Sequence, residues 1–206
     1  MCDHDTGISF NCCEQYMMYH KAMTFNDQHS VDAVMRTSDP REQKSLGKKV
    51  RGFKDHEWDK SKYDVVVQGN YLKFTQCTAP SDDGFVYPPP PLVNGRPIRG
   101  VSGHGKQGEK TSVSLRDLLL ATGSRELVEA APNDSVWGVG FSAEKAEELR
   151  LMDDGVGMTQ WGKNLLGRAL MEIRERIKAE DETGRRSETL REEGDQAVDP
   201  GTVGQE

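Results

Sequence analysis

A series of helix-start signals, each followed by apolar residues at helical spacing, constrains this chain more than any other feature. Asn, Asp and Ser favour helix N-termini because their side chains accept hydrogen bonds from the first backbone N–H groups, and an acidic residue three positions on strengthens the signal. The predicted helices span about 12–25, Asp27 to Met35, Asp39-Pro40 to near Gly47, Asp55 to Phe74, Ser114 to Gly123, and a last helix from near Asn164 past Ile177.

These segments predict a mainly α fold, a single compact helical domain with one or two short β-strands. A strand is expected at residues 126–131, Glu-Leu-Val-Glu-Ala-Ala. Hydrophobic residues make up 34% and charged residues 30% of the chain, so the core must be concentrated in a few amphipathic segments. The clearest apolar face belongs to the last helix and consists of Leu165, Ala169, Leu170, Ile173 and Ile177.

Two stretches are expected to lie outside the core. Residues 77–113 contain four consecutive prolines at 88–91 and many glycines, which predicts a disordered surface insertion. Residues 179–206 carry nine acidic residues against three arginines and few apolar ones, which predicts an acidic disordered tail. Most of the net charge of −7 therefore belongs to this tail, and the nearly neutral remainder is not expected to hold long nucleic acid by charge alone.

The cysteines, Cys2, Cys12, Cys13 and Cys77, form neither a CxxC pair nor a regular framework. Structural zinc and a disulfide scaffold therefore lack their usual spacing, and no metal or other cofactor is expected. The N-terminus shows no basic region followed by an apolar run, and no stretch approaches the ~18 apolar residues of a membrane span. We expect a cytoplasmic or nuclear protein with no membrane association.

Four polar or aromatic residues stand out, although each has an ordinary structural explanation. Glu14 fits a helix-capping carboxylate, and Lys21 on the same helical face fits a solvated lysine. Asp134 fits the start of an Asx-turn, and Trp137 fits an aromatic plug over the core. Taken singly, none of them identifies a functional site.

Together they resemble the NADAR family. Residues 10–22, Phe-Asn-Cys-Cys-Glu-Gln-Tyr-Met-Met-Tyr-His-Lys-Ala, are similar to the helix that opens that family's domain. The similarity covers most of residues 9–178 outside the 77–113 insertion, and several separated motifs occur in the family's order. These later motifs are Asp39 to Glu42, Leu46 to Phe53, Trp58, Leu115 to Thr122, Glu126 to Ala130, Asp134 with Trp137-Gly138, Asn164 to Gly167, and Leu170 to Arg174.

The resemblance implies a NADAR-like domain over residues 9–178 that hydrolyses N-glycosidic bonds of ribosylated compounds. The substrates implied are phosphoribosylamino-pyrimidine intermediates of riboflavin synthesis, or ADP-ribosylated guanine as a small molecule or within nucleic acid. The oligomeric state is left open. Matching the family's motifs residue by residue gives Glu14, Lys21 and Asp134 as catalytic residues, and Tyr16, Lys48, Arg51, Trp137, Gly138 and Asn164 as substrate-binding residues.

Two chemical routes fit these residue types. Because the anomeric carbon of a ribosylamine is a masked aldehyde, a neutral Lys21 amine can capture it as an imine while Glu14 and Asp134 move protons. Alternatively, the two carboxylates hydrolyse the bond directly, one activating water and the other protonating the leaving group. Trp137 would stack on the base or wall the ribose in either route.

The N-terminus departs from the family pattern. Members usually carry a strand-rich segment with an F-S-N-F-like motif ahead of the first helix, whereas only Met1 to Ser9 precede Phe10. Because that segment helps to build the family's pocket, two alternatives stay open beside the active enzyme. The first is a module that binds ADP-ribose or a related nucleotide without turnover, and the second is an inactive, truncated paralogue.

Overall fold

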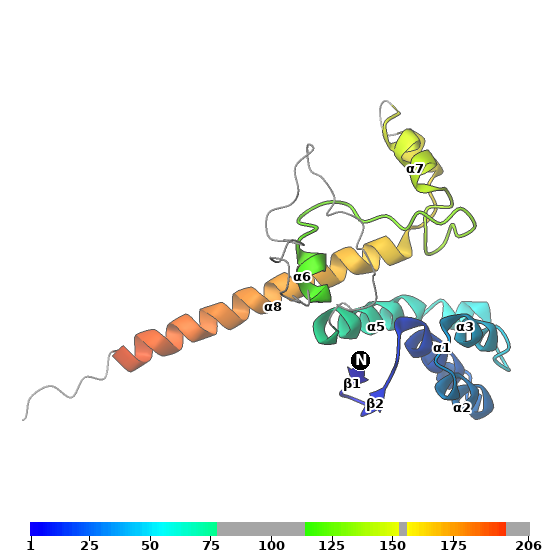
Figure 1. The fold of residues 1–206 in the computed structure, drawn as a ribbon, viewed down its shortest axis with the longest axis horizontal. Coiled ribbons are helices and arrows are strands. Elements are labelled where there is room, and N and C mark those ends of the chain that lie inside the picture. The colour runs from blue at the N-terminus through cyan, green and yellow to red at the C-terminus, as the bar shows by residue number, and fades with distance from the viewer. Residues whose placement is uncertain (78–113, 153–155, 197–206) are drawn as a thin grey trace, which may run out of the picture.

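The computed structural model describes residues 1–77, 114–152 and 156–196. The expected insertion at 77–113 therefore lies outside the described residues except for Cys77. Helices dominate, and Figure 1 shows most of the N-terminal ones grouped at one end of the molecule while one long helix extends away from them. In chain order the elements are β1 (Cys2–Asp3), β2 (Ile8–Ser9), α1 (Cys13–Thr24), α2 (Gln28–Arg36), α3 (Pro40–Gly47), α4 (Asp55–Trp58), α5 (Lys62–Gln76), α6 (Leu115–Leu120), α7 (Ala143–Arg150), the 3-10 turn η2 (Gly157–Gln160) and α8 (Leu165–Gln196).

The mainly α fold is confirmed, and three of the predicted helix starts have the expected caps. Asp27 accepts from the Ser30 N–H at the start of α2. Asp39 caps α3 with Pro40 in its first turn, and Ser114 accepts a 3.1 Å hydrogen bond from the Asp117 N–H at the start of α6. These short side chains satisfy backbone donors that a helix cannot satisfy internally.

Helix α1 begins differently from the expectation, although its bounds agree. The N-cap residue is Cys12, whose sulfur accepts from the Gln15 N–H. Gln15, not Glu14, reaches back to the Asn11 N–H at 2.8 Å, and its amide nitrogen donates to the Val34 carbonyl. The capping role expected for Glu14 was therefore wrong, and its carboxyl is free for another role.

The predicted helix from Asp55 to Phe74 is two helices in the structure. The short α4 ends at Trp58, which is 5% exposed, and a turn over residues 59–61 redirects the chain into α5. Because Trp58 lies before the bend, its ring is buried from α4 and does not have to lie on the face of α5 that packs against α1. Sequence periodicity does not reveal such a change of axis, because both pieces have helical spacing.

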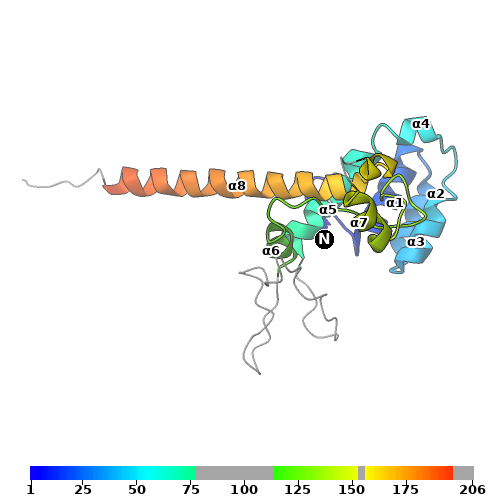
Figure 2. The same cartoon turned by 90° about the horizontal axis from the view of Figure 1, so that it is seen from above.

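The core has two parts that share α5. In the first, α1 packs among α2, α3 and α5 around Phe10, Tyr16, Tyr19, Val31 and Leu72. In the second, α5, α6 and α8 bury Leu119, Ile173 and Ile177, and Figure 2 shows α8 leaving the helical group beside α5 and α6. Tyr63 of α5 also donates to Glu172 of α8 at 2.9 Å. Helix α5 is thus the wall that joins the two halves of the fold.

The strand expected at 126–131 is absent, and the structure's small antiparallel sheet lies elsewhere. It pairs β1 with β2 in the register Cys2 with Ser9 and Asp3 with Ile8. Residues 126–131 are irregular, because their backbone groups bond to a side chain and to a later loop rather than to a neighbouring strand. The apolar pair Leu127 and Val128 produced the false strand signal.

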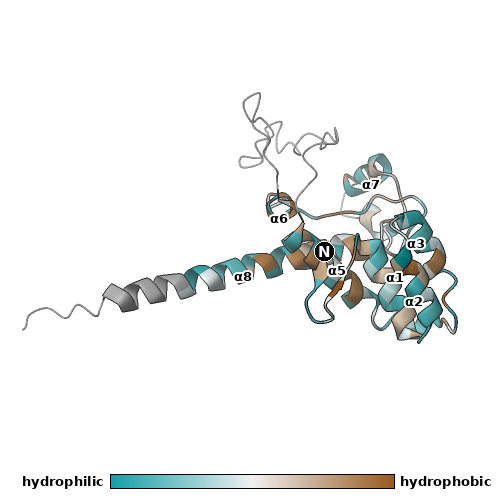
Figure 3. Cartoon of the chain, turned by 60° about the horizontal axis from the view of Figure 1, so that its bottom comes forward, coloured by the Kyte–Doolittle hydropathy of each residue, from teal (hydrophilic) through white to brown (hydrophobic). Residues whose placement is uncertain are grey.

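Helix α8 runs to Gln196, beyond residue 178, where we expected the chain to become disordered. Its continuation is anchored by Glu180, which accepts a hydrogen bond from Tyr71, and by Asp181, which forms an ion pair with Arg116. Figure 3 shows α8 hydrophobic in places beside α5 and mostly hydrophilic along the coloured stretch that follows. Beyond the residues of α8 that pack in the core, pairs along the helix such as Arg176 with Glu180 help to stabilise its continuation.

Helix α7 was not predicted, although Ser142 caps it and Ala146 and Leu149 are buried. The signal was present but spans only two turns. Within the described ranges, no helix combines the length and the apolar character needed to cross a bilayer.

Replacement of Gly69 by alanine is expected to destabilise the protein by about 1–3 kcal/mol, measured as the free energy of unfolding in urea. A Cβ at this position of α5 would lie 2.8 Å from a ring carbon of the buried Tyr16, so α1 and α5 would have to separate. Gly184→Ala is the matched control, because a Cβ there meets nothing within 4 Å and alanine favours a helix by about 1 kcal/mol. Equal effects of the two substitutions would contradict the close-packing explanation.

Candidate active site

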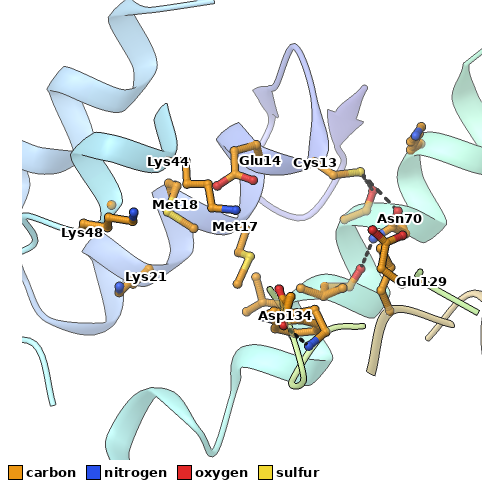
Figure 4. A pocket seen from close by; sticks show the side chains of 17 residues that line it. Cys13, Glu14, Met17, Met18, Lys21, Lys44, Lys48, Asn70, Glu129 and Asp134 are labelled. Carbon is orange, nitrogen blue, oxygen red and sulfur yellow. Dashed lines mark hydrogen bonds between the residues drawn. The ribbon is translucent and has the colours of Figure 1, made fainter. Parts of the chain in front are cut away.

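A cavity of about 570 Å³ opens where α1, α3 and α5 meet the loop that follows α6. Figure 4 shows side chains from the first helix and from this distant loop facing the same space. The polar residues that line the cavity are Glu14, Lys21, Lys44, Lys48, Asn70, Lys73, Glu129 and Asp134, and the walls include Cys13, Met17, Met18, Val65, Val66, Trp137 and Leu166.

Helix α1 presents Glu14, Met17 and Lys21 to the cavity because spacings of three and four residues repeat on one helical face. Glu14 is half-buried, and the loss of hydration raises the pKa of its carboxyl above the ordinary 4.5, an effect that Lys44 partly opposes. A carboxyl with a raised pKa keeps its proton closer to neutral pH. Glu14 is therefore suited to donate a proton to a leaving group.

Lys21 lies two turns further along α1 and is also half-buried. Burial lowers the pKa of its ammonium below the ordinary 10.5, while Asp55 acts in the opposite direction. Its Nζ lies 3.9 Å from the centroid of the Phe53 ring, a contact that favours the charged form. The net direction is still downward, so Lys21 reaches the neutral, nucleophilic state more readily than a solvated lysine does.

Asp134 begins the turn that carries Trp137 into the cavity wall. One carboxylate oxygen, Oδ1, accepts from the Val136 N–H at 2.9 Å and from the Trp137 N–H at 2.8 Å. The Asx-turn expected at Asp134 is therefore present. Because both bonds end on one oxygen, Oδ2 is left for the cavity that Asp134 lines.

The turn is held in place by the start of α8. The carbonyls of Val136, Trp137 and Gly138 accept from the backbone N–H groups of Leu165, Leu166 and Asn164 at 3.0–3.2 Å. A helix leaves its first N–H groups without internal partners, so the turn itself acts as the cap of α8. A Cβ on Gly138 would lie 2.6 Å from the Glu129 carbonyl, which shows how closely the loop segments approach.

Asn164 fastens the irregular segment before the turn. Its Oδ1 accepts from the Glu129 N–H at 3.0 Å, and its Nδ2 donates to the Leu127 carbonyl at 2.9 Å. With a φ of 48°, Asn164 also occupies the left-handed region that asparagine tolerates better than most residues. It is 6% exposed and supports the wall of the cavity from behind rather than lining it.

Of the nine predicted site residues, the structure brings Glu14, Lys21, Lys48, Asp134 and Trp137 together in the lining of the cavity. The other four lie outside that lining, and for two of them, Gly138 and Asn164, the structure shows a supporting position.

The two remaining residues lie apart from the cavity. Tyr16 is 4% exposed in the core, where its ring centroid is 4.9 Å from that of Phe10. Arg51 is exposed, and its backbone N–H donates to Asp27 at 2.8 Å.

Sequence reasoning missed Lys44, Asn70, Lys73 and Glu129 as lining residues. Lys44 of α3 lies four residues before Lys48, the residue that follows this helix, so that spacing was an available signal. Asn70 and Glu129 carried no comparable signal, because their place at the cavity depends on how α5 and the loop pack.

Cys13 also lines the cavity but is not suited to act as a nucleophile. Burial raises the pKa of its thiol to about 11, and its sulfur donates to the Gly69 carbonyl at 3.4 Å. Among the described residues, no three His, Cys, Asp or Glu side chains are grouped so as to hold a metal ion.

Asn164→Ala is expected to lower the free energy of unfolding by about 2–4 kcal/mol, because it leaves the Glu129 N–H and the Leu127 carbonyl without their partner. Urea unfolding measures the change. The exposed Asn133, replaced by alanine in the same way, should alter stability by less than about 0.5 kcal/mol. A loss of similar size in both variants would argue against the fastening role of Asn164.

The fold and the cavity together describe a helical domain with carboxyl and amino groups converging on one concave site. The chain belongs to the NADAR domain family, since the model of that family matches residues 2–178. The match includes the β1–β2 hairpin, and it also includes the helices and the loop that line the cavity.

The chain is also similar to individual proteins. A protein of Acanthamoeba polyphaga mimivirus named as an N-glycosidase is 35% identical over 163 residues, 79% of this chain and 71% of the viral protein. Protein irg-1 of Caenorhabditis elegans is 27% identical over 173 residues, 82% of this chain and 62% of the nematode protein. An N-glycosidase of Nostoc punctiforme is 40% identical over 68 residues, 33% of each chain.

Proposed function

We propose that this protein is an N-glycosidase, a hydrolase that cleaves the bond between a ribose C1 and a base nitrogen. The observation that carries the proposal is the sharing of one cavity by Glu14, with its raised pKa, and Lys21, with its lowered pKa. Perturbed acid and base groups gather at catalytic sites because each must be able to give or take a proton near working pH. The names of the viral and cyanobacterial relatives support the same class of reaction.

The imine route uses these groups as follows. The ribosylamine opens to an iminium at C1 as the ring oxygen takes a proton, and the neutral Lys21 amine adds to C1. The base nitrogen leaves with a proton from Glu14, which leaves an imine between C1 and Lys21. Water then adds to this imine, releases the ribose aldehyde and restores the lysine. The net reaction consumes one water and yields free base and sugar.

Direct hydrolysis is the competing route. Glu14 would protonate the leaving nitrogen while the Oδ2 atom of Asp134 accepts a proton from the attacking water. The two backbone N–H groups that donate to Oδ1 fix the orientation of the Asp134 carboxylate, and among the described residues Oδ2 is left without a hydrogen-bond partner at the cavity. Trapping of a covalent adduct separates the routes, because only the imine route forms a bond between enzyme and sugar.

As substrates we propose the phosphoribosylamino-pyrimidines of riboflavin synthesis or ADP-ribosylated guanine, free or within nucleic acid. Lys44 of α3 and Lys48, the residue that follows α3, support a phosphorylated ligand, because they add two cationic groups to one side of the cavity (Figure 4). Trp137 provides an aromatic wall for the base or the ribose.

Time courses of base release from both substrate types test the proposal. Free base should accumulate in proportion to enzyme and time with at least one of them. A ligand that raises the melting temperature without any release would instead support a binding module without turnover. Absence of both release and stabilisation would reject the proposed site altogether.

A further inference from the structure

Glu129 lies in the cavity on the side opposite Lys44 and Lys48, as Figure 4 shows. Its backbone is held on both sides, since its N–H donates to Asn164 at 3.0 Å and its carbonyl accepts from the Val139 N–H at 2.9 Å. A side chain on such a fixed backbone can define the position of a ligand group accurately. Glu129 lies within one of the family-like motifs, Glu126 to Ala130, but neither that resemblance nor the proposed catalytic route gives it a role.

The Glu129 carboxylate has no hydrogen-bond or ion-pair partner among the described residues, and Figure 4 shows it directed toward Asn70 of α5. The amide of Asn70 is partly occupied: Nδ2 donates to the Val66 carbonyl at 2.9 Å, and Oδ1 shares the Cys13 thiol as a donor with the Gly69 carbonyl. One N–H of Nδ2 is left over. Glu129 and Asn70 thus offer two acceptor oxygens and one donor at the same end of the cavity.

Glu129 also borders a second, mainly apolar pocket of about 290 Å³. That pocket shares Glu129 and Leu166 with the first one, and its other walls include Leu118, Leu119 and Leu127. A flat ring placed at the junction would meet apolar side chains and would turn its polar edge toward the carboxylate. Lys44 and Lys48 line the part of the cavity where we propose that the phosphate binds, and Lys73 of α5 also lines the cavity.

We infer that Glu129 recognises the base of the substrate by accepting two hydrogen bonds, one from a ring N–H and one from the adjacent exocyclic amine. Asn70 donates to the neighbouring ring carbonyl. The chemical class that fits is a 2-amino-4-oxopyrimidine ring, alone or as part of a purine, because it presents donor, donor and acceptor in that order. The inference rests on the proposed function, and it places the base in the cavity that Glu14, Lys21 and Asp134 also line.

The test compares two free bases, 2,6-diamino-4-pyrimidinone and 6-amino-4-pyrimidinone, in calorimetric titrations of the whole protein. They differ only in the 2-amino group. The wild type should bind the diamino base about 10–100-fold more tightly, the range expected for a hydrogen bond to a charged acceptor. Glu129→Gln should remove most of this preference, because the glutamine amide places a donor against a donor.

Glu126→Gln is the matched control, since Glu126 is exposed on the same segment and does not line the cavity. It should keep the full preference. Equal affinity of the two bases for the wild type, no measurable binding of either, or a preference that survives Glu129→Gln would overturn the inference.

Base release measured on the same samples separates the two proposals. A preference dependent on Glu129 in a protein that releases no base would reject the N-glycosidase activity and support the recognition by Glu129. Release of base by a protein that binds both free bases equally would support the N-glycosidase activity and reject the recognition by Glu129.

Discussion

Borohydride added during turnover is expected to attach a ribosyl group covalently to Lys21, and Lys21→Arg is expected to abolish the adduct and nearly all activity. An imine requires a neutral amine, and the half-buried Lys21 has a lowered pKa. Arginine keeps the positive charge but stays protonated, so it cannot add to C1. Mass spectrometry of the α1 peptide would locate the adduct, and the rate of base release would report the activity.

Lys49→Arg provides the control, because Lys49 is exposed and does not line the cavity. It should retain both the adduct and the rate. A Lys21→Arg protein that turns over at the normal rate would contradict the imine route and favour direct hydrolysis by Glu14 and Asp134. Circular dichroism would establish that each variant keeps its helical content.

Glu14→Gln is expected to slow turnover by about 10²–10⁴-fold, the usual contribution of a general acid or base. The fold should persist, because the cap of α1 depends on Cys12 and Gln15 rather than on Glu14. Steady-state rates of base release measure the loss, with Glu126→Gln as an exposed carboxylate control. A loss below about threefold would remove Glu14 from the reaction.

The pH profile of the rate gives an independent check. The imine route requires Glu14 with its proton and Lys21 without one, which predicts a bell-shaped profile for the wild type. The pKa of Glu14 is raised and that of Lys21 is lowered, so both shifts increase the fraction of enzyme in this state. In Glu14→Gln only the lysine titrates, so the residual rate should rise with pH and not fall again.

Local sequence signals predicted most of the helices, because a cap and its helix lie within one turn of each other. Asp27, Asp39 and Ser114 are examples whose hydrogen bonds are present in the structure. The signals failed where the partner of a backbone group is remote. Residues 126–131 resembled a strand, yet their partners are the side chain of Asn164 and the loop near Val139.

The candidate site was predictable to the extent that α1 determines it. Glu14 and Lys21 share a helical face, so their common placement follows from spacing alone. Asp134 and Trp137 came from the family resemblance. Glu129 and Asn70 could not be found by either means, because their position at the cavity depends on the packing of α5 and on the loop fastened by Asn164.

The pairing between the turn at 136–138 and the start of α8 also bears on the order in which the molecule folds. Contacts among α1, α2 and α3 join near neighbours in the chain and can form quickly, as can the turn with α8. The cavity needs Glu14 and Asp134 together, so it forms only when the part around α1 and the part around the start of α8 both pack against α5. A substrate held between them would then act as a clamp, and its largest effect on hydrogen exchange should appear at the α5–α8 contact.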